Sequence, residues 1–288
     1  MHQWKSILVA LMVCCALPLA GYAQLTHRYS FNDGTANDSV GGANGTLMNG
    51  ATVSGGQLQL INNGSNNPTS GEYVNLPSDI LNTKAFTVEA WATEQSNVAW
   101  QRILDLGNSV NGNGSGYIIL TPYNNPHTPL GQVSTSSGAT NFASGPIQGG
   151  NGYIAQGQQY QYAYVHDVTT GTEELYIDGL PVINQSSTPF TATIDASQLS
   201  LSNFWIGRSQ YAADPYFDGS INELRTYAQA LTPAQGEAEY VAGPDVVTVP
   251  EPATAVLAGI GVALASMRRR QRADATSNAD GFRLHSPA

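Results

Sequence analysis

Acidic side chains on extended runs are the first residues in this sequence that could do chemistry. A retaining glycoside hydrolase needs a nucleophile and an acid/base whose carboxyl groups lie about 5.5 Å apart. Carboxylates at alternate positions of one strand would meet that need, but the sequence has no Glu-x-Asp-x-Glu motif. The nearest candidates are Glu173, Glu174 and Asp178, and Asp178 precedes Gly179 between two β-type runs, which predicts a turn. Glu89 has no second carboxylate close enough on its strand, so we expect no catalytic residue and no enzyme activity.

A histidine and the glycine-rich stretches offer no better candidates. His166 and Asp167 are adjacent, and adjacent residues of a strand point to opposite faces, so they cannot pair directly. The stretch 111–116 lacks the Lys and the following helix of a phosphate-binding loop. A hydrolase stays open as an alternative only through a carboxylate pair from different strands, such as Glu89 with a residue across the sheet.

Aromatic residues are the candidates for ligand binding. Four of them fall in predicted loops or at loop edges, where flat rings could stack against a sugar: Trp100, Tyr123, Tyr211 and Tyr216. Loops on a rigid scaffold are where binding residues concentrate. The alternative is that these rings pack on neighbouring strands, since isolated surface aromatic residues are common.

Short strands must position these side chains. From Leu25 to about Tyr240, short apolar or alternating runs are separated by Gly, Asn, Pro and Ser, which is typical of a sandwich or barrel. The run 86–91 alternates, so one of its faces should belong to the core. The run 160–166 alternates as well, and the turn at Asp178 predicts a hairpin.

One helix is predicted, over residues 232–240. Thr232 can cap it, Pro233 suits its first position, and Gln235 completes the pattern of a capping box. The sequence therefore predicts a sandwich with one short surface helix near its end.

Four segments in this order resemble LamG-like, concanavalin A-like domains. They are the Tyr-Ser-Phe of the opening strand, FTVEAW, ELYIDGLPV and FDGSINELRTYAQALTPAQ, and they cover about Leu25 to Glu239. The resemblance implies an all-β fold of two antiparallel sheets, a jelly-roll sandwich over residues 24–241. Such folds include lectins, adhesion modules and glycoside hydrolases, so the fold alone does not decide the function.

The resemblance also implies a calcium ion, because relatives often bind one through oxygen ligands of acidic loops. The candidate ligands are Asp33 and Asp38 in the first loop and Asp218 near the last strand. The alternative is that the first two are ordinary turn formers. Asn222 stands where several relatives have an aspartate.

Charge and cysteine content exclude several kinds of partner and site. Residues 24–249 contain five Lys and Arg against 18 Asp and Glu, a formal charge of −13. This charge would repel nucleic acid and an anionic bilayer, so we expect no nucleic-acid partner. Both cysteines, Cys14 and Cys15, lie in the N-terminal apolar run, so we expect no disulfide or thiolate metal site in the mature chain.

The N-terminal segment, residues 1–23, is predicted to be a secretory signal peptide. Lys5 precedes an apolar stretch from Ile7 to Ala20, and small residues stand at the −3 and −1 positions of a cut after Ala23. A retained membrane helix is the weaker alternative, because a span requires roughly 20 apolar residues.

The C-terminal segment, residues 250–272, has three parts. They are Pro250-Glu251-Pro252, an apolar stretch over 253–267, and a basic cluster with Arg268, Arg269 and Arg270. Such arginines stay on the cytoplasmic side, so we expect transient membrane insertion. The pattern resembles the PEP-CTERM sorting signal of Gram-negative bacteria, which implies processing by an exosortase-type membrane enzyme and release or attachment at the cell surface.

We predict a linker over residues 242–249, before the sorting pattern, and a polar tail over residues 273–288, after it. The tail departs from the family, whose members usually stop soon after the arginines. A plain C-terminal membrane anchor is therefore the alternative.

Together these features predict an exported cell-surface or extracellular-matrix protein. We expect it to bind extracellular polysaccharide or a glycoconjugate through loops of the sandwich. A structural matrix protein without a sugar site is the alternative, and a glycoside hydrolase with an atypical carboxylate pair is a third.

Overall fold

The computed structural model describes residues 24–64, 70–78, 80–112, 114–124, 128–148, 154–184 and 188–248. The predicted signal peptide and the sorting residues Pro250, Glu251, Pro252, Arg268, Arg269 and Arg270 lie outside the described residues. Within the described residues most elements are strands, because β-branched and aromatic residues recur between turns rich in Gly and Asn.

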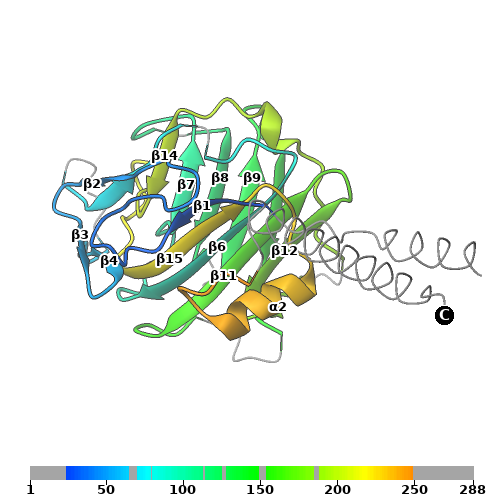
Figure 1. The fold of residues 1–288 in the computed structure, drawn as a ribbon. Helices are drawn as coiled ribbons and strands as arrows, with labels where there is room; N and C mark the ends of the chain where they lie inside the picture. Colours follow the sequence, from blue (N-terminus) through cyan, green and yellow to red (C-terminus); the bar gives the residue numbers. More distant parts are fainter. Residues whose placement is uncertain are drawn as a thin grey trace, which may run out of the picture. The chain divides into compact units, whose positions relative to one another are not determined.

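Eight strands form the first antiparallel sheet, called sheet A, whose strands cross the front of the domain in Figure 1. The strand order is β13-β12-β11-β6-β15-β4-β3, and β1 pairs with β15. Their bounds are β1 Leu25–Tyr29, β3 Thr52–Ser54, β4 Gln57–Leu60, β6 Ala85–Glu94, β11 Gln159–Asp167, β12 Thr172–Ile177, β13 Leu180–Pro181 and β15 Gly219–Tyr227.

Seven strands form the second antiparallel sheet, called sheet B, in the order β10-β9-β8-β7-β14-β5-β2. Their bounds are β2 Thr46–Met48, β5 Tyr73–Asn75, β7 Leu104–Gly107, β8 Tyr117–Thr121, β9 Leu130–Ser134, β10 Thr140–Ser144 and β14 Asn203–Ile206. Two short helices complete the described elements, η1 at Ala196–Gln198 and α2 at Pro233–Ala242. The predicted all-β, two-sheet jelly-roll sandwich is confirmed.

The core lies between the two sheets, and alternate residues of each strand face it. In β6 the core residues are Phe86, Val88 and Ala90, as the alternation predicts. In sheet B, Leu104 and Leu106 of β7 face the core, and the residues between such positions point to the outside.

The other face of sheet A is buried as well, including the position of Glu89. Thr87, Glu89 and Trp91 are all at most 3% exposed. The cause is α2, which lies along this face in Figure 1. The amide of Gln161 in β11 lies 3.4 Å from the carbonyl of Gly236 in α2.

The predicted turn and helix cap are confirmed. Asp178 and Gly179 both have positive φ, 51° and 73°, as the two-residue hairpin between β12 and β13 requires. The side chain of Thr232 accepts a hydrogen bond from the Gln235 backbone, and the side chain of Gln235 accepts one from the Thr232 backbone. Pro233 occupies the first turn.

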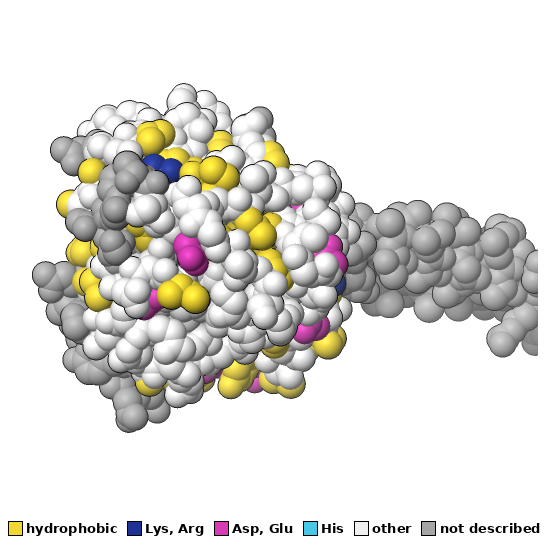
Figure 2. Space-filling model, turned by 90° about the vertical axis from the view of Figure 1, so that its left-hand side faces the viewer, with side chains coloured by type: hydrophobic (Ala, Val, Ile, Leu, Met, Phe, Trp, Pro, Cys, Tyr) yellow, Lys and Arg dark blue, Asp and Glu magenta, His cyan; other side chains and the backbone are white. Residues whose placement is uncertain are grey.

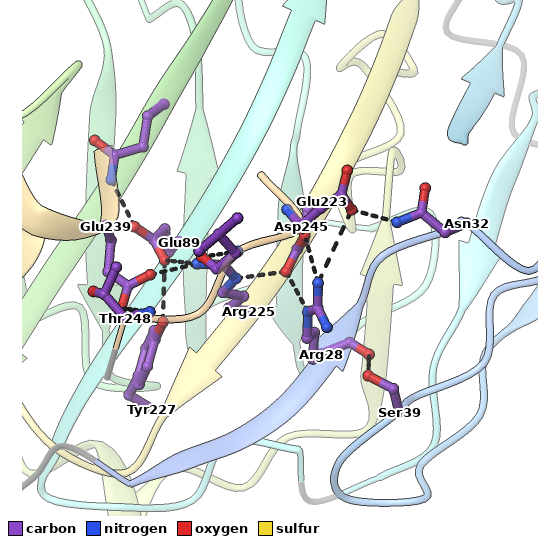
Figure 3. A network of polar contacts seen from close by, with 12 residues as sticks. Arg28, Asn32, Ser39, Glu89, Glu223, Arg225, Tyr227, Glu239, Asp245 and Thr248 are labelled. Atoms are coloured by element: carbon purple, nitrogen blue, oxygen red, sulfur yellow. Dashed lines mark hydrogen bonds and ion pairs between the residues drawn. The ribbon is translucent and has the colours of Figure 1, made fainter. Parts of the chain in front are cut away.

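A buried polar network joins sheet A to α2 (Figure 3). At its centre, Arg225 donates from Nη1 to Glu239 at 2.6 Å and from Nε to Glu223 at 2.5 Å. Its Nη1 also lies 3.4 Å from Glu89. All four side chains are fully buried, and Arg225 is the cation that the three acidic residues share, while Glu223 also pairs with Arg28 at 2.6 Å.

The described part of the predicted linker is attached to this network (Figure 3). Glu223 accepts from the backbone N–H of Asp245 at 2.6 Å, and Arg225 donates to the carbonyl of Val246 at 3.1 Å. Glu239 accepts from the N–H and the hydroxyl of Thr248, at 3.0 and 2.7 Å. The chain therefore stays fixed to the outer side of sheet A up to Thr248.

Candidate ligand-binding surface

The outer face of sheet B, opposite the core, is where most of the predicted binding residues gather. A row of outward side chains crosses this sheet from β10 to β5, in the order Phe142, Gln132, Ile119, Asp105, Trp205 and Asn75. Neighbouring strands lie about 4.8 Å apart, so roughly 10 Å separates Phe142 from Ile119. The strand register fixes these positions, because the residues between them are anchored in the core.

Trp100 and Tyr211 lie together on this face. Both rings are partly exposed, and both pack against Tyr117, Ile119 and Leu130. The ring of Tyr211 meets that of Tyr117 edge to face, with centroids 6.0 Å apart, and its hydroxyl donates to the carbonyl of Gly114 at 2.6 Å. The two rings therefore rest on a fixed apolar base.

The backbone of Trp100 is strained, with a φ of 71° in the left-handed region. For a residue with a bulky side chain this costs on the order of 1 kcal/mol. The conformation is held from two sides, because the Trp100 N–H donates to the Tyr123 carbonyl at 2.9 Å and Arg102 donates to the Trp100 carbonyl at 2.6 Å. Such strain concentrates at functional sites.

The other two predicted binding residues, Tyr123 and Tyr216, present almost no surface. Tyr123 is 2% exposed, belongs to the main core and donates its hydroxyl to the Ile154 carbonyl. Tyr216 is 3% exposed and packs with Tyr73 and Trp205 under the outer face of sheet B. The loops fold back onto the strands, so the rings fill space there and only Trp100 and Tyr211 could stack on a ligand without rearrangement.

A charged network fixes the loop that carries Tyr211. Arg102 donates to Asp214 at 2.6 Å and lies 3.6 Å from Asp105. Asp105 accepts from the backbone N–H of Gln210 at 3.0 Å. Burial raises the pKa of Asp105 to about 6, although the charge of Arg102 opposes that rise. The loop is thus tied to β7 through buried charge.

Unpartnered polar atoms concentrate around this network. Of the nine buried side-chain polar atoms without a hydrogen-bond partner among the described residues, six lie here: Arg102 Nε, Asp105 Oδ1, Ser109 Oγ, Arg208 Nε, Gln210 Nε2 and Tyr216 OH. Buried polar groups normally have hydrogen-bond partners, and of these six atoms Arg102 Nε lies within ion-pair distance of Asp105, at 3.6 Å. Their clustering distinguishes this face from the rest of the described domain.

The three predicted calcium ligands do not form a group. Asp33 is exposed and accepts from Thr35 and Asn37 within its own loop. Asp38 is buried and accepts from four backbone N–H groups and from His27. Asp218 accepts from the N–H of Asn62. No three His, Cys, Asp or Glu side chains gather into a metal site in the described ranges, and calcium remains a prediction.

The carboxylates considered for catalysis form hydrogen bonds or ion pairs away from this surface. Glu89 lies in the buried network beneath α2, where a sugar cannot reach it. Glu173 accepts from the hydroxyl of Tyr164 at 2.5 Å and lies 2.6 Å from His166 Nδ1, both inside the domain. His166 thus pairs with Glu173 rather than with Asp167, and Asp178 accepts from a backbone N–H at the hairpin.

Sequence reasoning missed Phe142, which is 48% exposed at the edge of the row on sheet B. It also missed Gln132, the neighbour of Phe142 in register. The available signal was the alternation of Thr140, Phe142 and Ser144 around Asn141 and Ala143, which places a phenylalanine on the polar face of a strand.

Comparison with known families identifies two parts of the chain. A model of the concanavalin A-like lectin/glucanases superfamily matches residues 65–235, and the chain belongs to this superfamily. A model of the PEP-CTERM protein-sorting motif matches residues 248–271, which confirms the predicted sorting signal. The signal indicates export and a membrane-associated sorting step at the C-terminal end. In the part of the chain that the structure describes, no helix combines the length and apolar character of a membrane span.

Several solved structures share the fold. Domain 4 of AbnA, a GH43 extracellular arabinanase from Geobacillus stearothermophilus in complex with arabinotriose, matches with a TM-score of 0.55 and 21% identity, over 75% of this chain and 98% of that chain. A Trypanosoma rangeli sialidase in complex with sialic acid matches with a TM-score of 0.55 and 15% identity, over 79% of this chain and 34% of that chain.

The binding domain of botulinum neurotoxin DC in complex with rat synaptotagmin II also matches, with a TM-score of 0.55 and 12% identity, over 76% of this chain and 52% of that chain. No curated protein matches the sequence. At these identities the likeness establishes the fold alone.

Proposed function

We propose that this protein is an exported, non-enzymatic binding protein that holds extracellular polysaccharide on the outer face of sheet B. The observation that supports the proposal most is the pair of partly exposed rings, Trp100 and Tyr211, on one fixed apolar base. Flat rings with a polar edge bind well where one side is apolar and the other is wet. The strained backbone at Trp100 and the unpartnered polar atoms nearby favour the same face.

The fold and the sorting signal support an extracellular location for this activity. The chain belongs to a superfamily of lectins and glucanases, and domain 4 of AbnA was solved with arabinotriose. We propose cell-surface or matrix display after processing by an exosortase-type enzyme at the sorting motif. Calcium through Asp33, Asp38 or Asp218 remains part of the proposal and enters the test as a separate arm.

The test is retention of the full chain on a glycan array and on exopolysaccharide, with calcium and with chelator. A double variant, Trp100→Ala with Tyr211→Ala, should weaken retention about tenfold or more, since aromatic anchors at an interface typically cost above 1 kcal/mol each. Tyr240→Ala is the matched control, because this tyrosine is 40% exposed on α2, against the outer face of sheet A.

Each outcome assigns a function. Retention that depends on the ring pair and is accompanied by no release of reducing sugar supports the binding protein. Equal retention by the double variant removes the outer face of sheet B from the account. Absence of retention on every glycan favours the structural matrix protein, and release of reducing sugar would favour the hydrolase.

A further inference from the structure

A cavity of about 340 Å³ lies at the edge of the sandwich, away from Trp100 and Tyr211. Residues of β12, of β13 and of the segment that follows line it: Glu173, Glu174, Pro181, Val182, Ile183, Asn184, Thr188, Pro189 and Phe190. Its volume falls at the lower end of the range for small-molecule sites, roughly 300–1,000 Å³. Five of the nine lining residues are apolar and four have polar or acidic side chains, so the lining combines apolar walls with polar groups.

The wall of this cavity is rigid on both sides. The Val182 N–H donates to the Leu175 carbonyl of β12 at 2.8 Å, and the Ile183 N–H donates to the Pro146 carbonyl at 3.0 Å. A side chain at Gly145 would collide with the backbone of Ile183, because a Cβ there would lie 2.1 Å from its carbonyl oxygen. Residues 181–183 therefore form a fixed bridge between β12 and the segment after β10.

Apolar side chains stay exposed around the cavity. Ile183 in its wall is 44% exposed. Phe190, also in its wall, meets Phe142 with ring centroids 6.3 Å apart, and Phe142 is 48% exposed. Contiguous exposed apolar surface with polar groups at its edge indicates an interaction site.

Charge complementarity indicates what the cavity would take. Glu174 lines it and forms no ion pair among the described residues, and its carboxylate accepts a hydrogen bond from the hydroxyl of Tyr176. Four of the five cations of residues 24–249 are paired with carboxylates, and the fifth, Arg208, lies over aromatic rings. Figure 2 shows a different side of the domain, the one that carries β2, β3 and β4 in Figure 1, and there too most side chains are uncharged, with a few acidic and basic ones. A ligand with a positive charge would therefore be attracted.

We propose that this cavity binds a sugar ring that bears a protonated amine. The ring would lie against Phe190, and its ammonium group would meet the carboxylate of Glu174. The choice of a sugar over other amines rests on the proposed function, whereas the requirement for positive charge follows from the cavity itself.

The experiment compares a glucosamine trimer with its N-acetylated counterpart by calorimetric titration of the full chain at low salt. The amine trimer should bind about three- to fivefold tighter, the size of a partly exposed ion pair, and high salt should reduce the difference. Glu174→Gln should abolish it. Glu237→Gln removes the same charge from an exposed site on α2 and should leave it intact.

A second variant separates the ring contact from the charge. Phe190→Ala should weaken binding of both trimers about threefold or more, since it removes aromatic contact but no charge. Equal affinity for the two trimers, or a preference that survives Glu174→Gln, overturns the inference. If glycan retention through Trp100 and Tyr211 persists in that case, the proposed function stands without this cavity; if no glycan binds in either experiment, both fail.

Discussion

At the residue scale, the buried carboxylates of sheet A have a structural role. Glu89 and Glu239 approach one another only because both bind Arg225, and no solvent reaches them. Burial raises the pKa of Glu89 to about 8, while the charge of Arg225 opposes the rise and that of Glu239 adds to it. The role of Glu89 is therefore structural, and its ionisation should affect the stability of the fold.

We expect stability to fall as the pH rises from about 4.5 to 8. Over that window the folded state keeps a proton on Glu89 that the unfolded chain has released. The free energy of unfolding therefore decreases as the pH rises, by about 1.4 kcal/mol per unit of difference between the folded and unfolded pKa of Glu89. Because the pKa of Asp105 is also raised, to about 6, Asp105 contributes a further decrease of the free energy of unfolding with pH, and this contribution ends near pH 6. Glu89→Gln should flatten the slope between pH 6 and 8, as measured by urea unfolding.

The control for this measurement is Glu237→Gln, an exposed carboxylate on the same side of the sheet. Its pH profile should match that of the unmodified chain. An unchanged slope in Glu89→Gln would show that Glu89 is ionised in the folded protein throughout this range.

Single residues also mark the limit of what the sequence predicts about the site. That Trp100, Tyr211 and Tyr216 come from loops was visible in the sequence, and these loops converge on one face. The sequence does not show which of these rings is exposed, because the burial of each ring depends on how far its loop folds back over β7, β8 and β14. Tyr123 illustrates this, since its ring passes into the core between the sheets.

At the scale of elements, strands in which polar and apolar residues alternate could be predicted from the sequence. Strands that are buried on both faces could not. The strands β6, β11 and β15, the hairpin at Asp178 and the helix α2 follow from periodicity and turn chemistry. The strand pairing between residues 107 and 157 could not be predicted from the sequence. In β8 all five residues are buried, because Trp100 and Tyr211 cover one face and the core covers the other, so no polar alternation marks the strand.

The capping box of α2 gives a prediction at this scale. Thr232→Ala removes the side chain that accepts from Gln235 and should lower the free energy of unfolding by about 1 kcal/mol. Chemical denaturation measures the change. Ser136→Ala, at an exposed turn, is the control and should change stability by less than about 0.5 kcal/mol. Equal losses in the two variants would contradict a role of the cap in holding α2.

At the scale of the whole domain, the two outer faces of the sandwich are covered differently. The outer face of sheet A binds α2 and the segment through Thr248, next to the sorting motif. The outer face of sheet B carries Trp100 and Tyr211 on the opposite side of the sandwich.

Accessibility of Trp100 to a fluorescence quencher tests the central claim most directly. Trp91 and Trp205 are 3% and 5% exposed, so in a Trp4→Phe chain Trp100 is the accessible tryptophan among the described residues. Iodide quenching should decrease when a retained glycan is added, and Trp100→Phe should remove that decrease. Binding of the glycan with unchanged quenching would contradict the account, because the ligand would then lie away from Trp100.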